Sequence, residues 1–294
     1  MRKKIIGIIC NLFFLVPLFS QTVSFDSLVR EFADAINPAL PLAANMGLNW
    51  STPYVGQIIG YPMHFGLGVF VGSAFMGNSE LSALGEAMGL TIEESMIKGK
   101  QWLPNYAVVA RIGGVADIPF DVGIKVGFLP DTALWGSLNY NSTLFGFDVH
   151  YAVHIPPRNG PVITVGLGYD RLMSEINGMG RIPDSDFETD ELARIVWESH
   201  TITAQMAFSQ PVLSTGLSLF GGVALGAGIN RAGVKFGSDM NDPVYENMKG
   251  MFTLFFSGSA GIGYEIGVFR IDASFRWNFI NFEPGLGIGF RYQR

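Results

Sequence analysis

Residues 269–279 read Phe269-Arg270-Ile271-Asp272-Ala273-Ser274-Phe275-Arg276-Trp277-Asn278-Phe279, so that apolar and polar side chains alternate without a break. Successive side chains of a β-strand point to opposite faces, which gives this segment one apolar face and one polar face. Similar runs recur along the chain. Their polar positions are too rich in glycine and charge to form the surface around a packed soluble core. The pattern therefore favours apolar side chains that face lipid and polar side chains that face a lumen.

The composition supports a membrane barrel. Mean hydropathy is +0.30 although no stretch after the N-terminus is long and apolar enough for a membrane helix. Barrels reach such values because their apolar residues are spread over every second position. Without the three basic residues at positions 2–4, the chain has 16 of its 19 Lys and Arg residues and all 25 Asp and Glu residues, which gives a net charge of −9. A net negative chain without a basic patch argues against nucleic acid as a partner.

Residues 1–20 have the pattern of a secretory signal peptide. Arg2, Lys3 and Lys4 precede an apolar run that ends at Phe19, and Ser20 is small enough for a cleavage site. The alternative, a retained N-terminal anchor, is disfavoured because the apolar run is short for a membrane span. The single cysteine lies within this segment, so the mature chain is predicted to contain no disulfide, thiolate metal site or cysteine nucleophile.

Residues 24–36 are predicted to form an amphipathic helix. Apolar residues from Phe25 to Ile36 recur at helical spacing, Ser24 can cap the start, and Asn37-Pro38 ends the pattern. We expect residues 21–62 to comprise this helix and a connector ahead of the barrel. The segment has two interpretations: it plugs the lumen, or it lies on the periplasmic side of the membrane.

The barrel itself is predicted over residues 63–294, an all-β transmembrane antiparallel β-barrel of about ten strands, with eight or twelve as alternatives. The predicted strands are 64–76, 103–114, 119–129, 143–155, 160–171, 198–210, 216–230, 252–266, 268–280 and 284–293. Short turns alternate with long polar segments at 77–102, 130–142, 172–197 and 231–251. Outer-membrane barrels have short periplasmic turns and long extracellular loops, so the first strand is predicted to run outward.

The last strand carries a motif of its own: Gly287-Ile288-Gly289-Phe290-Arg291-Tyr292. It resembles the C-terminal assembly signal of bacterial outer-membrane β-barrel proteins, except that two residues follow the final aromatic. The chain as a whole resembles that class in architecture and is OmpW-like or small porin-like. The resemblance implies location in the cell outer membrane, contact with outer-membrane lipid and insertion by the barrel assembly machinery.

The polar positions of the strands predict a lumen lined by glycine and by charged and histidine side chains, among them Asp121, His154 and Arg291. Charges of both signs there can pair across neighbouring strands. The candidate constriction residues are Arg111, Lys125, Asp148, His150, Arg270, Asp272 and Arg276. The leading hypothesis is a channel for passive passage of small solutes through a narrow lumen, with no cofactor, no metal and no enzymatic step. Glycine stripes favour open volume, whereas the charged belt favours a plug.

Two alternatives remain open at this stage. The first is a structural or adhesive barrel that acts through its acidic extracellular segments, with a closed lumen. The second is a barrel hydrolase of the omptin type, since Asp148 and His150 share one face of a strand. The chain departs from that pattern because no matching acidic pair precedes them on an early strand.

Overall fold

The computed structural model describes ten stretches of the chain, and the predicted signal peptide lies outside them. The described residues are 24–45, 64–90, 100–113, 118–135, 138–155, 160–181, 191–212, 215–237, 243–280 and 284–293. Their elements are α2 (Phe25–Ile36), α3 (Leu40–Ala44), β1 (His64–Gly77), α4 (Ser79–Ala87), β2 (Lys100–Gly113), β3 (Phe120–Trp135), β4 (Leu138–His154), β5 (Val162–Gly180), β6 (Glu191–Pro211), β7 (Leu217–Phe236), β8 (Tyr245–Ile266), β9 (Phe269–Asn278) and β10 (Pro284–Gln293). No helix among these residues has the length and apolarity needed to cross a membrane.

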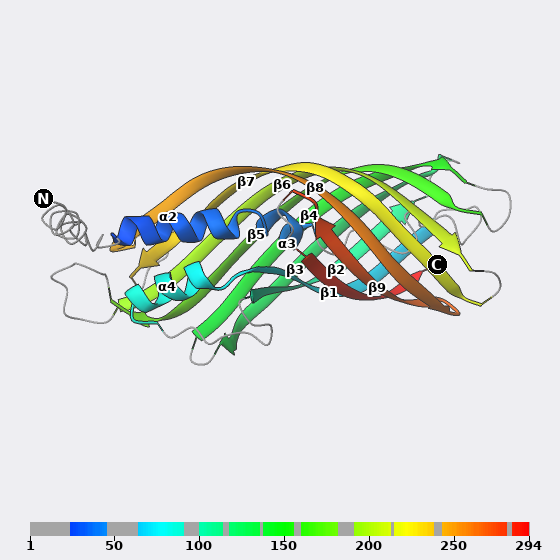
Figure 1. Cartoon of the computed structure of the whole chain (residues 1–294). Coiled ribbons are helices and arrows are strands. Elements are labelled where there is room, and N and C mark those ends of the chain that lie inside the picture. The colour runs from blue at the N-terminus through cyan, green and yellow to red at the C-terminus, as the bar shows by residue number, and fades with distance from the viewer. Residues whose placement is uncertain are drawn as a thin grey trace, which may run out of the picture.

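Within the described residues, ten strands close into one antiparallel barrel (Figure 1). Each strand pairs with its neighbours in sequence, and β1 closes the ring against β10 through a ladder from Gly66↔Gln293 to Ala74↔Gly285. The predicted strand number, antiparallel order and N-terminal helix are confirmed. We call the end that joins β4 to β5, β6 to β7 and β8 to β9 the turn end, and the opposite end the loop end.

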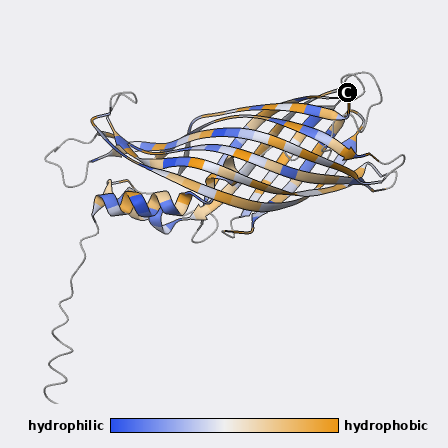
Figure 2. Cartoon of the chain, turned by 90° about the horizontal axis from the view of Figure 1, so that it is seen from above, coloured by the Kyte–Doolittle hydropathy of each residue, from blue (hydrophilic) through white to orange (hydrophobic). Residues whose placement is uncertain are grey.

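The two faces of the wall lie as the alternation predicts. Phe275 and Ile271 point outward and are 42% and 44% exposed, whereas Arg270 and Asp272, on either side of Ile271, point inward and are 5% and 6% exposed. Every strand contributes exposed apolar side chains to the exterior. The hydropathy colouring in Figure 2 shows apolar and polar residues mixed along the strands. An apolar exterior around a polar bore is the arrangement of a transmembrane barrel.

Strands β3 to β8 extend further at the loop end than predicted. Most residues of the segments expected as long loops belong to strands instead. In the predicted 172–197 loop, residues 172–180 and 191–197 continue the ladder between β5 and β6. The outward side chains turn polar there, as in the ion pair between Arg171 and Glu198 at 2.7 Å. The lipid-facing pattern therefore ends while backbone hydrogen bonding continues, which is why the sequence pattern placed the boundaries too early. A further helix, α4, occupies part of the predicted 77–102 loop.

Strands β9 and β10 are short, which leaves a notch in the wall at the loop end. Strand β9 pairs with β8 only over Ser257–Ile266. Residues 245–256 of β8 thus have β7 on one side and no described strand on the other. Helix α2 lies beside this free edge (Figure 1). The rings of Phe25 and Tyr245 are 6.3 Å apart, and the Asn37 side chain donates to the Phe252 carbonyl at 3.5 Å.

Helix α2 forms where the sequence predicts it. The Ser24 hydroxyl accepts a hydrogen bond from the Ser27 N–H at 3.3 Å and so satisfies one of the free donors of the first turn. Its apolar face is buried and its charged face is exposed. The buried face of α2 and the whole of α3 belong to one hydrophobic core that fills the loop-end half of the interior, together with α4 and inward residues of the strands.

Candidate functional site

The site begins at the middle of the barrel, where α3 ends. The carbonyl oxygen of Ala44 accepts a hydrogen bond from Lys125 Nζ on β3, and the carbonyl of Asn45 accepts one from Arg276 on β9 at 2.8 Å. The Asn45 side chain donates to the Thr203 hydroxyl at 3.0 Å. Cations favour the C-terminal end of a helix, whose last carbonyls have no partner within the helix. Three strands thus hold Ala44 and Asn45, the last described residues of the N-terminal segment, inside the bore.

Helix α2 is held at the loop end by polar contacts with β7 and β8. Asp26 accepts hydrogen bonds from Lys249 at 2.8 Å and from Asn247 at 3.2 Å, while the Asn230 side chain donates to that of Asn37 at 2.6 Å. The hydrogen bond from Lys249 lowers the pKa of the Asp26 carboxyl below its ordinary value, with a further contribution from Asn247. The described part of the N-terminal segment, residues 24–45, is therefore fixed to the wall by polar groups at both of its ends.

A first ionic cluster fills the turn-end half on the side of β2, β3 and β4. Arg111 pairs with Asp121 at 2.5 Å and with Asp148, and it approaches His150 Nδ1 at 2.6 Å. The other ring nitrogen of His150 contacts the Gln205 side-chain amide on β6. These side chains are 8% exposed or less. The buried Arg111 guanidinium thus joins Asp148 and His150 in an internal network, and neither the carboxylate nor the imidazole reaches solvent.

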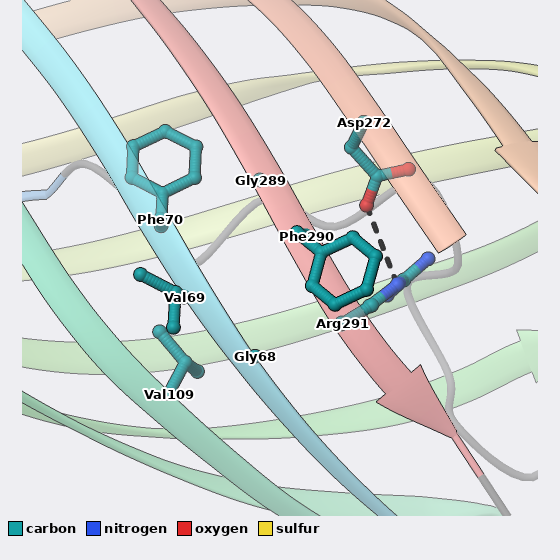
Figure 3. A pocket seen from close by; sticks show the side chains of 8 residues that line it. All are labelled: Gly68, Val69, Phe70, Val109, Asp272, Gly289, Phe290 and Arg291. Carbon is teal, nitrogen blue, oxygen red and sulfur yellow. Dashed lines mark ion pairs between the residues drawn. The ribbon is translucent and has the colours of Figure 1, made fainter. Parts of the chain in front are cut away.

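A second ionic cluster lies on the side of β7 to β10. Arg270 donates to the Ser218 hydroxyl and lies 3.7 Å from both Glu265 and Asp272. Arg291 Nε lies 3.3 Å from the other oxygen of Asp272 (Figure 3). The cavity beside this pair is only about 10 Å³. That volume is close to the minimum for a single water molecule, so this cavity has no room for a larger solute.

The seven predicted constriction residues all point inward and are at most 8% exposed. They do not form one ring, because the structure distributes them over three places. Arg111, Asp148 and His150 belong to the first cluster, Arg270 and Asp272 to the second, and Lys125 and Arg276 hold the N-terminal segment. Lys125 also pairs with Asp170 at 2.8 Å. The sequence identified the inward charges but not the backbone carbonyls that two of them bind, since a carbonyl leaves no signature in a sequence.

The glycine stripes make room for side chains of adjacent strands. A Cβ atom placed on Gly166 would meet the His150 ring, and one on Gly287 would meet the ring of Phe70. Glycine at these positions lets the neighbouring side chain approach the backbone closely. The glycines therefore do not mark open volume in the described structure, and the filled bore agrees with the plug interpretation of the charged belt.

One predicted lumenal residue lies elsewhere. His154 is exposed at the end of β4, because the ladder with β5 shifts register between Ala152 and His154. A one-residue shift turns a side chain to the other face of a strand. Within the described ranges, no three His, Cys, Asp or Glu side chains gather closely enough to hold a metal ion.

Comparisons with known proteins show similarity at the level of architecture. No protein-family model matches the chain, and no curated protein matches it. The translocator domain of the autotransporter NalP from Neisseria meningitidis is 10% identical, with a TM-score of 0.39 over 92% of this chain and 99% of that chain. Ail, the attachment invasion locus protein of Yersinia pestis, crystallised with a heparin analogue, is 13% identical, with a TM-score of 0.32 over 80% of this chain and 100% of that chain.

The toluene transporter TbuX of Ralstonia pickettii is 10% identical, with a TM-score of 0.28 over 81% of this chain and 90% of that chain. Likenesses this weak carry no conclusion about activity. The outer-membrane type of barrel expected from the sequence is confirmed as an architecture by the closed sheet and its apolar exterior.

Proposed function

We propose that the protein is an outer-membrane channel that is closed by its own N-terminal segment and passes small solutes passively when that segment shifts. The observation that carries the proposal is the attachment of α3. Lys125 and Arg276 hold its terminal carbonyls in mid-barrel, where residues 39–45 are completely buried. The proposal involves no cofactor and no covalent chemistry.

The barrel does not depend on this segment for its backbone hydrogen bonds. The ladders run from strand to strand around the ring, and α2 and α3 contact the wall through side chains and a few carbonyls. Each charge-assisted hydrogen bond to α3 contributes about 1.5–3 kcal/mol. Helix α2 also covers the notch beside β8, so its displacement would open the loop-end half of the interior to the outside.

The proposed location is the bacterial outer membrane, with lipid as the partner of the apolar exterior. The aromatic side chains at the turn end support this placement: the ring of Phe269 lies 5.5 Å from that of Phe290 and 5.8 Å from that of Tyr292. Such aromatic groups mark the membrane interface of transmembrane barrels. The C-terminal motif lies on β10, consistent with insertion by the barrel assembly machinery.

The test uses a reversible lock on α2. Residues 21–294 contain no cysteine, so Asn37→Cys with Asn230→Cys introduces a unique pair at two side chains that contact each other. The pair is joined by a short, reducible thiol cross-linker, and single-channel currents are recorded in planar bilayers. We expect the currents of the double variant to disappear on cross-linking and to return on reduction. The cross-linker should leave the currents of either single-cysteine variant unchanged. Currents that persist through the lock would show that passage does not require movement of α2.

The structure also favours a second candidate, a structural or adhesive barrel. Strands β5 to β8 continue toward the loop end as a largely polar sheet, with ion pairs such as Lys235–Glu246 at 3.3 Å on its surface. A folded protein that never conducts, locked or unlocked, would favour this function over a channel.

A further inference from the structure

An aromatic side chain of α2 occupies a seat on the inner wall of the loop-end half. The ring of Phe32 meets that of Trp197 on β6 edge to face, with centroids 6.4 Å apart. Trp197 stacks in turn on Tyr140 of β4 at 6.0 Å. All three side chains are at most 2% exposed. Aromatic pairs at these distances attract each other beyond the simple burial of area.

The two wall aromatics differ in how their polar atoms are satisfied. The Tyr140 hydroxyl donates to the Pro104 carbonyl at 3.1 Å and lies 3.4 Å from the Ser174 hydroxyl. The indole N–H of Trp197 is fully buried and has no acceptor among the described residues. A buried tryptophan N–H nearly always finds an acceptor. If the seat served only to pack α2, phenylalanine or leucine would fill it without an unsatisfied donor.

A line of hydrogen bonds leads from this seat to the plug. Ser174 donates to Ser142 at 3.0 Å, Ser142 donates to Asn105 at 2.6 Å, and Asn105 donates to the Ala43 carbonyl in α3 at 3.4 Å. Tyr140 begins this line through Ser174. The wall of the seat is thus connected to the segment that closes the bore.

We infer that the seat of Phe32 is a binding site for a small aromatic molecule that carries a hydrogen-bond acceptor, and that this molecule displaces Phe32 and releases α2. The ring of the ligand takes the place of the phenyl group against Trp197, and its acceptor receives the indole N–H. Phe32 is then an internal competitor that keeps the segment closed until the ligand arrives. The inference deepens the proposed channel function, because it rests on α2 being displaceable.

Binding is measured directly, so that it does not depend on channel activity. Residues 21–294 are labelled with 5-fluorotryptophan and folded in detergent, and Trp197→Phe identifies the Trp197 fluorine signal by its absence. The probe is acetophenone, which has a ring and a carbonyl acceptor. Ethylbenzene has the ring alone, and cyclohexyl methyl ketone has the acceptor without an aromatic ring.

The test variant is Phe32→Ala, and the matched control is Phe25→Ala. Phe25 lies on the same buried face of α2 but packs on Tyr245, away from the seat. Truncation of Phe32 removes the internal competitor. If Phe32 leaves the seat free in about a tenth of the unmodified molecules or fewer, the apparent affinity of the ligand should rise at least about tenfold when Phe32 is removed. Phe32→Leu replaces Phe32→Ala if the alanine variant fails to fold.

We expect acetophenone to shift the Trp197 signal and to bind Phe32→Ala at least about tenfold more tightly than Phe25→Ala. In an Asn37→Cys variant that retains Phe32, acetophenone should speed maleimide labelling of the thiol, because α2 is released. Equal affinities in the two alanine variants would overturn the inference, as would ethylbenzene or the cyclohexyl ketone shifting Trp197 as strongly as acetophenone. Absence of bilayer currents would count against the channel and leave these binding results intact.

Discussion

Replacement of Arg276 by methionine tests how the bore is closed. Methionine keeps much of the aliphatic length of arginine but cannot donate to the Asn45 carbonyl, which Arg276 contacts at 2.8 Å. Lys125 is less suitable, because its loss would also leave the buried Asp170 carboxylate without its ion-pair partner at 2.8 Å. Arg276→Met therefore removes one attachment of the N-terminal segment with the least disturbance of the wall.

The expected size follows from the hydrogen bond that is lost. Arg276 is 8% exposed, so solvent replaces little of the interaction while the segment stays seated. A charge-assisted hydrogen bond contributes about 1.5–3 kcal/mol, which corresponds to an increase of about 10- to 150-fold in the ratio of displaced to seated segment. Channel openings in planar bilayers should become more frequent by a similar factor, at unchanged protein concentration and voltage.

Arg270→Met is the matched control. Arg270 is a buried arginine on the same inward face of β9, about 20 Å along the strand toward the turn end, and it belongs to the cluster with Asp272 and Ser218. Its replacement should alter stability and any ion preference of the bore, but not the frequency of opening. The reasoning about the plug is refuted if Arg276→Met opens no more often than the unmodified chain, or if both methionine variants raise the frequency equally.

Three further outcomes are expected. Arg111→Met leaves two buried carboxylates without their cation and should lower the free energy of unfolding in urea by about 3–5 kcal/mol. Gly287→Ala should lower it by about 1–3 kcal/mol, because the new methyl group meets the Phe70 ring, whereas Gly250→Ala, with no atom within 4 Å, should change it by less than about 0.5 kcal/mol. The stabilising contact of Asp26 is present above the ordinary carboxyl pKa of 3.8 and is lost as pH falls through the lowered folded value. The protection of the α2 amides against hydrogen exchange, relative to the intrinsic exchange rate at each pH, should therefore fall only in acid.

Each outcome has its own check. An Arg111→Met protein as stable as the unmodified one would show that the carboxylates are solvated and that the first cluster is not sealed. Equal effects of the two glycine variants would remove the close approach as the reason for the glycine stripes. An acid response of α2 that survives in Asp26→Asn would assign that response to another group.

Much of the wall could be predicted from the sequence because it depends on a local property. The two-residue period of 269–279 places Phe275 and Arg276 on opposite faces whatever lies around them. The helix from Phe25 to Ile36 is local in the same sense, since its cap and its apolar spacing lie within one stretch. Strand ends were predicted less well, because the polar alternation beyond the lipid-facing belt resembles that of a loop.

The site could be predicted only in part. Inward charges such as Arg111 and Lys125 are visible as polar positions in apolar alternation, but their partners come from other strands through the register of the closed sheet. Asp121 and Arg291 were recognised as inward-facing, yet nothing local distinguished them as partners of the candidate residues. The glycines suggested open space, and only the positions of neighbouring rings showed that it is filled.

By itself, the sequence determined the sidedness of the wall and the helix ahead of it, because side-chain alternation and helical spacing act over a few residues. It predicted about ten strands, and the closed sheet established that number among the described residues. The tertiary structure decided what occupies the bore. Closure of the ring brings Lys125 and Arg276, which lie far apart in the chain, to the same end of α3, and the short β9 and β10 leave the notch that α2 covers. Such meetings depend on register and strand length across the whole barrel, and no single segment encodes them.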